Sequence, residues 1–155
     1  MSELSTPKGA VMPRRAFFAA ALSAITAGGA VGLAMWGGVD APATESFQFS
    51  RGVLFQAGEA ERLQAYLAKA TLDDRIDVTI IGHSGTAGDA TANTELSQNR
   101  ADIALEAAAT LGIGRGRLTA IGLGGASPLA QESGESDRAW QARLARVEVS
   151  MQVRR

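Results

Sequence analysis

Hydrophobic and polar positions divide the chain into one long apolar stretch and a region of short periodic segments. Residues 16–39 carry no charged side chain and read AFFAAALSAITAGGAVGLAMWGGV. At ~1.5 Å per residue, a helix over them is about 36 Å long, more than the roughly 30 Å of a bilayer's hydrocarbon core. We therefore predict a transmembrane helix over 16–39, after a tail over 1–15 and before a linker over 40–46.

Charges on either side of this stretch predict its orientation. The tail carries Lys8, Arg14 and Arg15 against Glu3, whereas residues 40–155 carry 12 basic and 15 acidic side chains. Positively charged flanks stay in the cytoplasm. We expect a single pass through a bacterial inner membrane, with the N-terminus cytoplasmic and the C-terminal region periplasmic.

A cleaved export signal is a second interpretation of the same stretch. Arg14 and Arg15 precede a moderately hydrophobic Ala/Gly-rich run, as in twin-arginine signals, and 41–43 has the small-x-small form of a cleavage site. The apolar run of a cleaved signal usually spans about 7–15 residues, so the length here favours an uncleaved signal anchor. Both interpretations export the region that follows.

Small residues recur along the predicted span. Ala20, Ala24, Gly28 and Gly32 are four apart and share one helix face, on which another transmembrane helix can approach closely. Such a stripe also arises by chance in an Ala/Gly-rich segment. Packing on other transmembrane helices, or on an inner-membrane complex, is one of two interpretations.

Residues 47–155 alternate between the two-residue period of strands and the 3.6-residue period of helices. We predict strands that begin at 47 and that span 76–81, 118–123 and 147–153, and helices over 59–70, over 93–111 and after an N-cap at Ser136. The apolar face of the second helix is predicted to hold Leu96, Ile103, Ala104, Ala107 and Leu111. This order indicates an α+β fold, a βαβαβ-type sandwich with an added strand and helices packed on a mixed sheet.

Composition excludes several classes of chemistry. The chain has no cysteine and a single histidine, His83, which rules out disulfides, thiolate metal sites and multi-histidine zinc sites. A formal net charge of -1 and a pI of about 5.8 argue against nucleic-acid binding.

The candidate catalytic motifs are incomplete. A nucleophile elbow needs G-x-S-x-G, and the chain reads GHSGT over 82–86. The glycine-rich segment over 122–127 lacks the third position of the dinucleotide fingerprint. Asp73, Asp74 and Asp77 fit a solvated turn better than a metal site. We predict a protein that is not an enzyme and holds no cofactor or metal.

Several motifs over 78–149 together resemble one known family. They are Gly82-His83-Ser84, N-x-x-L-S-x-x-R-A over 93–101, Leu111-Gly112-Ile113, Gly122-x-Gly124, Pro128 and Arg146-Val147-Glu148-Val149. This pattern resembles the OmpA-like C-terminal domain and covers most of residues 47–153. The resemblance implies a βαβαβ fold with an added strand, and non-covalent binding of peptidoglycan through the diaminopimelate of its stem peptide.

The resemblance also implies site residues. The family arginine is Arg100, which could hold a ligand carboxylate bidentately, and the matching asparagine and histidine are Asn93 and His83. The family aspartate, which accepts from the ligand's ammonium, falls on Gly85. Asp89 is the alternative acceptor if the loop folds back. A purely structural role for Arg100 stays open, as does the closing motif, where the family's Asn-Arg-Arg is Leu-Ala-Arg over 144–146.

Two functions follow from these observations. The first is a membrane-anchored periplasmic domain that associates with peptidoglycan without catalysis. The second is an accessory structural subunit of an inner-membrane complex, which packs through its transmembrane helix and its OmpA-like domain. The missing aspartate and the short linker favour the second, and the resemblance favours the first.

Overall fold

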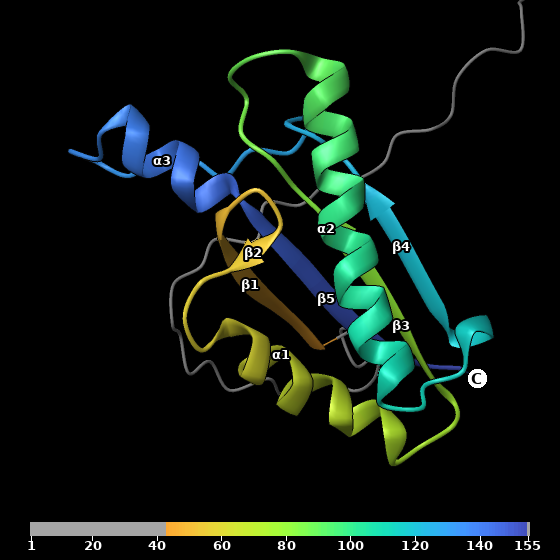
Figure 1. Cartoon of the computed structure of the whole chain (residues 1–155). Coiled ribbons are helices and arrows are strands. Elements are labelled where there is room, and N and C mark those ends of the chain that lie inside the picture. Colours follow the sequence, from red (N-terminus) through yellow and green to blue (C-terminus); the bar gives the residue numbers. More distant parts are fainter. Residues whose placement is uncertain (1–42, 155) are drawn as a thin grey trace, which may run out of the picture. The chain divides into compact units, whose positions relative to one another are not determined.

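The computed structural model describes residues 43–154, which fold as a sheet covered by helices (Figure 1). Its elements in chain order are β1 (Ala43–Arg51), β2 (Leu54–Phe55), α1 (Glu59–Leu67), β3 (Ile76–Gly82), α2 (Ala90–Thr110), β4 (Leu118–Gly122), α3 (Asp137–Leu144) and β5 (Arg146–Val153). Short 3-10 turns follow α1 at Ala68–Thr71 and precede β4 at Arg115–Arg117.

The sheet is mixed, with strand order β2-β1-β5-β3-β4. β3 and β4 are parallel, as the helical crossover α2 between them requires. β5, the last strand in the chain, lies between β1 and β3 and is antiparallel to both. The α+β fold with helices on a mixed sheet is therefore confirmed, and the loop after β3, the start of α2 and the loop after β4 meet at one end of the parallel pair.

Alternate residues of the central strands form the core. The fully buried strand residues, two apart as strand geometry requires, are Phe47, Phe49, Val78, Ile80, Val147 and Val149. They join one cluster with Leu63, Tyr66 and Leu67 of α1 and Ala101, Ala104 and Ala108 of α2. Figure 1 shows α1 and α2 over the same side of the sheet.

The buried face of α2 differs from the predicted face. It consists of Ser97, Arg100, Ala101, Ala104 and Ala108. Of the predicted five, only Ala104 is fully buried, while Ile103 and Leu111 are 37% and 36% exposed. The apolar-stripe rule fails here because α2 lies so close to the strands that serine and alanine fill most of the space between them, and Arg100 is the one large side chain on this face.

Two glycines allow this close approach. A Cβ on Gly82, at the end of β3, would overlap the carbonyl of Ser97 and lie 2.8 Å from its carbonyl carbon. A Cβ on Gly122, at the end of β4, would lie 2.6 Å from Ser97 Oγ and 2.7 Å from Gln98 Cα. The first half of α2, which carries Asn93 and Arg100, is seated directly on these strand ends.

Two elements begin more than one residue away from the predicted start, and one strand was not predicted. β1 begins at Ala43, so the last four residues of the predicted linker are strand, because they pair with β5 from Met151 to Glu148. α2 begins three residues early, at Ala90. The two-residue strand β2 was not predicted, since it is too short to show a period.

Within residues 43–154, no helix combines the length and apolar character that a bilayer crossing requires. The predicted transmembrane helix over 16–39 lies outside the described residues. The same holds for its small-residue face, Ala20, Ala24, Gly28 and Gly32.

Candidate functional site

The loop between β3 and α2 forms one wall of the candidate site. Asp89 is the N-cap of α2, and its Oδ1 accepts from the backbone N–H of Ala92 at 2.8 Å. One turn later, Asn93 Nδ2 donates to the carbonyl of Ala87 at 2.9 Å. Both bonds fold the loop onto the first turn of α2, so one oxygen of Asp89 is occupied by the helix.

The Arg100 side chain bonds the first residue of this loop. Its Nη1 donates to the carbonyl of His83 at 2.8 Å, and its Nε donates to the carbonyl of Gly52 at 2.7 Å. The guanidinium carbon lies 5.1 Å from the ring centroid of Phe49, a cation–π distance. Arg100 thus ties the β1–β2 turn to the end of β3.

The charge of Arg100 is buried without an anion. Only 4% of the residue is exposed, and desolvation lowers the pKa of its guanidinium. Within residues 43–154, no carboxylate forms an ion pair with it, and its two hydrogen-bond acceptors are neutral carbonyls. A buried cation is costly unless it is paired, and an anion is the chemical group that would complement this one.

His83 is buried at the start of the same loop, in contact with the partly buried Arg146–Glu148 ion pair. It is 3% exposed, and neither ring nitrogen has a hydrogen-bond partner in the described part of the chain. Its Nε2 lies 3.6 Å from Glu148 Oε2, while Glu148 Oε1 accepts from Arg146 at 2.7 Å. The His83 imidazole and then the Arg146 guanidinium hold the pKa of Glu148 at about 2, although burial raises it. His83 therefore offers the site its carbonyl, which Arg100 uses, and not its ring.

Helix α3 also contacts this loop, through Gln141. Gln141 Oε1 accepts from the backbone N–H of Thr86 at 3.0 Å, and Gln141 Nε2 donates to Thr86 Oγ1 at 2.8 Å. A Cβ on Gly85 would fall inside contact distance of the same Oε1. At the position where the resemblance expects an aspartate, the chain has a glycine that faces a glutamine amide.

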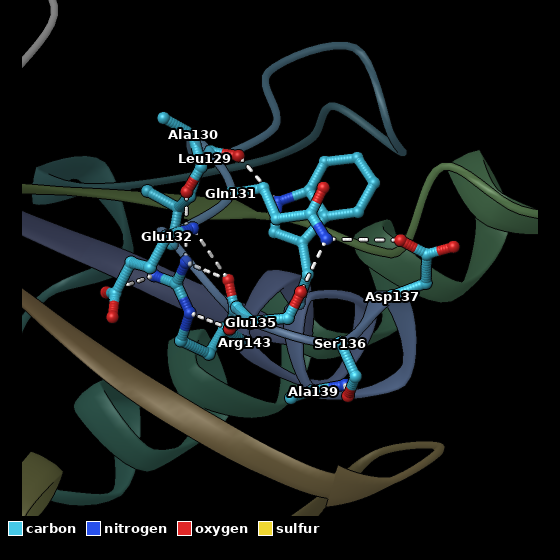
Figure 2. A network of polar contacts seen from close by, with 10 residues as sticks. Leu129, Ala130, Gln131, Glu132, Glu135, Ser136, Asp137, Ala139 and Arg143 are labelled. Carbon is cyan, nitrogen blue, oxygen red and sulfur yellow. Dashed lines mark hydrogen bonds and ion pairs between the residues drawn. The ribbon is translucent and has the colours of Figure 1, made fainter.

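Figure 2 shows the polar network that fixes α3 to the loop before it. Arg143 donates through Nε and Nη2 to the two carboxylate oxygens of Glu135, at 2.7 and 2.8 Å. This fork holds the pKa of Glu135 at about 2. Trp140 Nε1 donates to the carbonyl of Leu129 at 2.7 Å, and Ser136 caps α3 as predicted. The network therefore fixes the helix that carries Gln141, and the two bonds to Thr86 position its amide.

A shallow, open depression lies beside the loop. Its lining is Gly85, Thr86, Gly88, Ala90, Asn93, Thr94, Leu123, Gly125 and Ala126. Of the four predicted ligand-binding residues, Asn93 lines it, Arg100 and His83 are buried, and Asp89 caps α2. Gly125 is required here, because a Cβ on it would lie 2.6 Å from the carbonyl oxygen of Gly85.

Four participants were not predicted from the sequence: Thr86, Gln141, Glu148 and the carbonyl of Gly52. Gln141 contacts a residue 55 positions away, and no local pattern indicates such a pairing. Glu148 belongs to the closing motif of the resemblance, and that motif is the only signal that marked it. Within residues 43–154, no group of three or more His, Cys, Asp or Glu side chains is placed to hold a metal ion.

Comparison with known families agrees with this geometry. The model of the OmpA family matches residues 46–141. This chain belongs to the OmpA family. Among curated proteins, no match was found.

Solved structures with OmpA-like domains have the same fold. The chain is similar to the peptidoglycan-associated lipoprotein from Burkholderia pseudomallei, with 24% identity over 69% of this chain and 89% of that chain and a TM-score of 0.60. It is similar to a putative MotB-like protein from Desulfovibrio vulgaris, with 28% identity over 72% and 75% of the two chains and a TM-score of 0.56. A periplasmic domain of Helicobacter pylori MotB matches at 14% identity over 76% and 80%, with a TM-score of 0.59.

Proposed function

We propose that this OmpA-family domain binds peptidoglycan non-covalently, on the periplasmic side of an inner membrane to which residues 16–39 anchor it. The ligand site is the rim formed by the loop over 83–88, Asn93 and Arg100. The domain performs no catalysis, and the bound group is a stem peptide of the cell wall.

The observation that carries this proposal is the unpaired guanidinium of Arg100. It is 4% exposed and bonded only to neutral carbonyls within the described residues. A ligand carboxylate that reaches its remaining N–H groups supplies the missing anion, and a charge-assisted bond of this kind is roughly twice as strong as a neutral one. Family membership and the similarity to a peptidoglycan-associated lipoprotein support the choice of ligand.

Cosedimentation of the full chain with purified sacculi tests the proposal. We expect the wild type to pellet with the sacculi, and Arg100→Met to lose at least about tenfold in retention, because the loss of one charged hydrogen-bond partner typically has an effect of this size or larger. The matched control is Arg115→Met, since Arg115 pairs with the exposed Glu106 and lies away from the loop.

Arg100→Met also leaves two carbonyls without donors, so a second variant separates binding from folding. Asn93→Ala removes a partly exposed amide that lines the depression and bonds one carbonyl of the loop. Thermal unfolding monitored by circular dichroism is expected to change little in this variant, while retention falls. Retention that is unchanged in both variants, or equal loss in Arg115→Met, contradicts the proposal.

A second function, an accessory subunit of an inner-membrane complex, is favoured by the position of β1. Because β1 begins at Ala43, only residues 40–42 separate it from the predicted span. Three residues reach at most about 11 Å, which suits a domain that works next to the membrane. Co-purification in mild detergent tests this function: Gly28→Leu or Gly32→Leu is expected to release a partner, and a protein that purifies alone contradicts it.

A further inference from the structure

Gln141 takes up the space beside Gly85 that another side chain would fill. Both of its amide groups bond Thr86, through Oε1 to the backbone N–H at 3.0 Å and through Nε2 to Oγ1 at 2.8 Å. A Cβ on Gly85 would meet that Oε1 first, and Gln141 Cδ at 3.6 Å next. The glutamine amide therefore lies across the direction in which residue 85 would project.

The backbone at position 85 does not itself require glycine. Gly85 is not among the glycines with a positive φ, unlike Gly88 three residues later. Apart from Gln141, the nearest atom to its Cβ position is the backbone N of Ala87, at 4.0 Å. A larger residue at position 85 would therefore have to displace the Gln141 amide from Thr86, and the two residues share one space beside the loop.

The charge of the rim follows from this pairing. Thr86 and Asn93 in the rim, and Gln141 beside it, contribute neutral hydroxyl and amide groups, and Arg100 contributes a positive charge. Asp89 has one oxygen engaged with Ala92 at the start of α2. The rim thus suits a carboxylate next to an uncharged polar group. The space beside position 85 holds the neutral amide of Gln141, which gives a ligand ammonium no charged acceptor.

Gln141 and Arg100 are near enough to act on one ligand. Arg100 bonds the carbonyl of His83, and Gln141 bonds the N–H of Thr86. Three residues apart, these loop atoms are separated by at most about 11 Å. The ion pair of Arg143 with Glu135 (Figure 2) and the Trp140 hydrogen bond fix the helix that carries Gln141, and its bonds to Thr86 place the amide at the loop.

We propose that Gln141 determines specificity in this site, and that the Gly85–Gln141 pair selects a stem-peptide residue whose amine is uncharged, as in an acylated or amide-linked amine, over one with a free ammonium. This inference rests on the proposed function, that the rim binds a stem peptide. The carboxylate of the same residue pairs with Arg100, and its neutral amide bonds Gln141 or Thr86. A cross-linked stem peptide, in which that amine is part of an amide bond, belongs to the selected class.

Two peptides and two variants test the inference by isothermal titration calorimetry on the full chain. The peptides are L-Ala-γ-D-Glu-diaminopimelate with a free side-chain amine, and the same peptide with that amine acetylated. The test variant is Gln141→Glu, which keeps the shape and the acceptor for Thr86 N–H but adds a charge. The matched control is Gln64→Glu on the exposed side of α1, which makes the same chemical change away from the loop.

The wild type is expected to bind the acetylated peptide at least as tightly as the free amine. Gln141→Glu is expected to shift the ratio of the two affinities toward the free amine by at least about tenfold, as a new charge-assisted bond implies, and Gln64→Glu is expected to leave the ratio unchanged. If both peptides bind but Gln141→Glu does not change the ratio, the role of Gln141 is refuted and the proposed function stands. If neither peptide binds the wild type or Gln141→Glu, both proposals fail.

Discussion

The close contact between α2 and the ends of β3 and β4 predicts that one added methyl group lowers the free energy of unfolding substantially. In Gly82→Ala, the new Cβ would overlap the carbonyl of Ser97 and lie 3.3 Å from Ala101 Cβ. The blocking atoms are helix backbone, so no side-chain rotation relieves the contact and α2 must move away from β3. Overpacking typically costs ~1–3 kcal/mol, and a backbone obstacle places the expected loss of unfolding free energy at about 3 kcal/mol.

Thermal and urea unfolding measure this loss. For a domain of this size, about 3 kcal/mol corresponds to a decrease in Tm of roughly 10–20 °C. The control is Gly116→Ala, because its Cβ would meet no atom within 4 Å and its φ is not positive; a change within about 1 kcal/mol of the wild type is expected. If Gly82→Ala unfolds within about 0.5 kcal/mol of the wild type, α2 is not seated as described.

Three further predictions concern the N-cap of α2, the Glu148 ion pair and the polar network before α3. Asp89→Ala removes the N-cap of α2 and is expected to cost ~1 kcal/mol in urea unfolding, whereas Asp89→Asn should cost much less. Glu148 has a folded pKa of about 2 against an ordinary 4.5, so its contribution is complete above pH 4.5 and is lost as pH falls through 2. Because its side chain is 32% exposed, we expect the wild type to lose about 1–2 kcal/mol more than Glu148→Gln over that range; parallel pH profiles would refute this. Arg143→Met should speed hydrogen exchange over 129–136, unlike Arg138→Met, and equal exchange in the two variants would contradict the network.

The strands could be predicted because their periods are simple. Val147, Val149 and Met151 alternate with polar residues, and the structure buries these three. Family motifs located Arg100 and Asn93, whose side chains bond the loop carbonyls on either side of Gly85.

The helix face and the second half of the site could not be predicted. Large apolar residues such as Ile103 and Leu111 were assigned to the interior, but the helix face that packs on Gly82 and Gly122 carries Ser97 and Ala101 there. Gln141 gave no signal, because its role depends on a contact between α3 and a loop that the sequence alone does not bring together. Close approaches and long-range pairings arise from tertiary geometry, which hydrophobic periodicity does not encode.

The most direct test of the central claim is an NMR titration of the isotopically labelled chain with the soluble acetylated stem peptide. The account predicts that the largest shift changes occur at the Nε–H of Arg100, the backbone N–H of Thr86 and the side-chain amides of Asn93 and Gln141, and that they saturate together. Resonances of Arg115 and α1 should stay unchanged. Shift changes confined to surfaces away from the loop would contradict it. So would the absence of shift changes at peptide concentrations that compete the protein off sacculi.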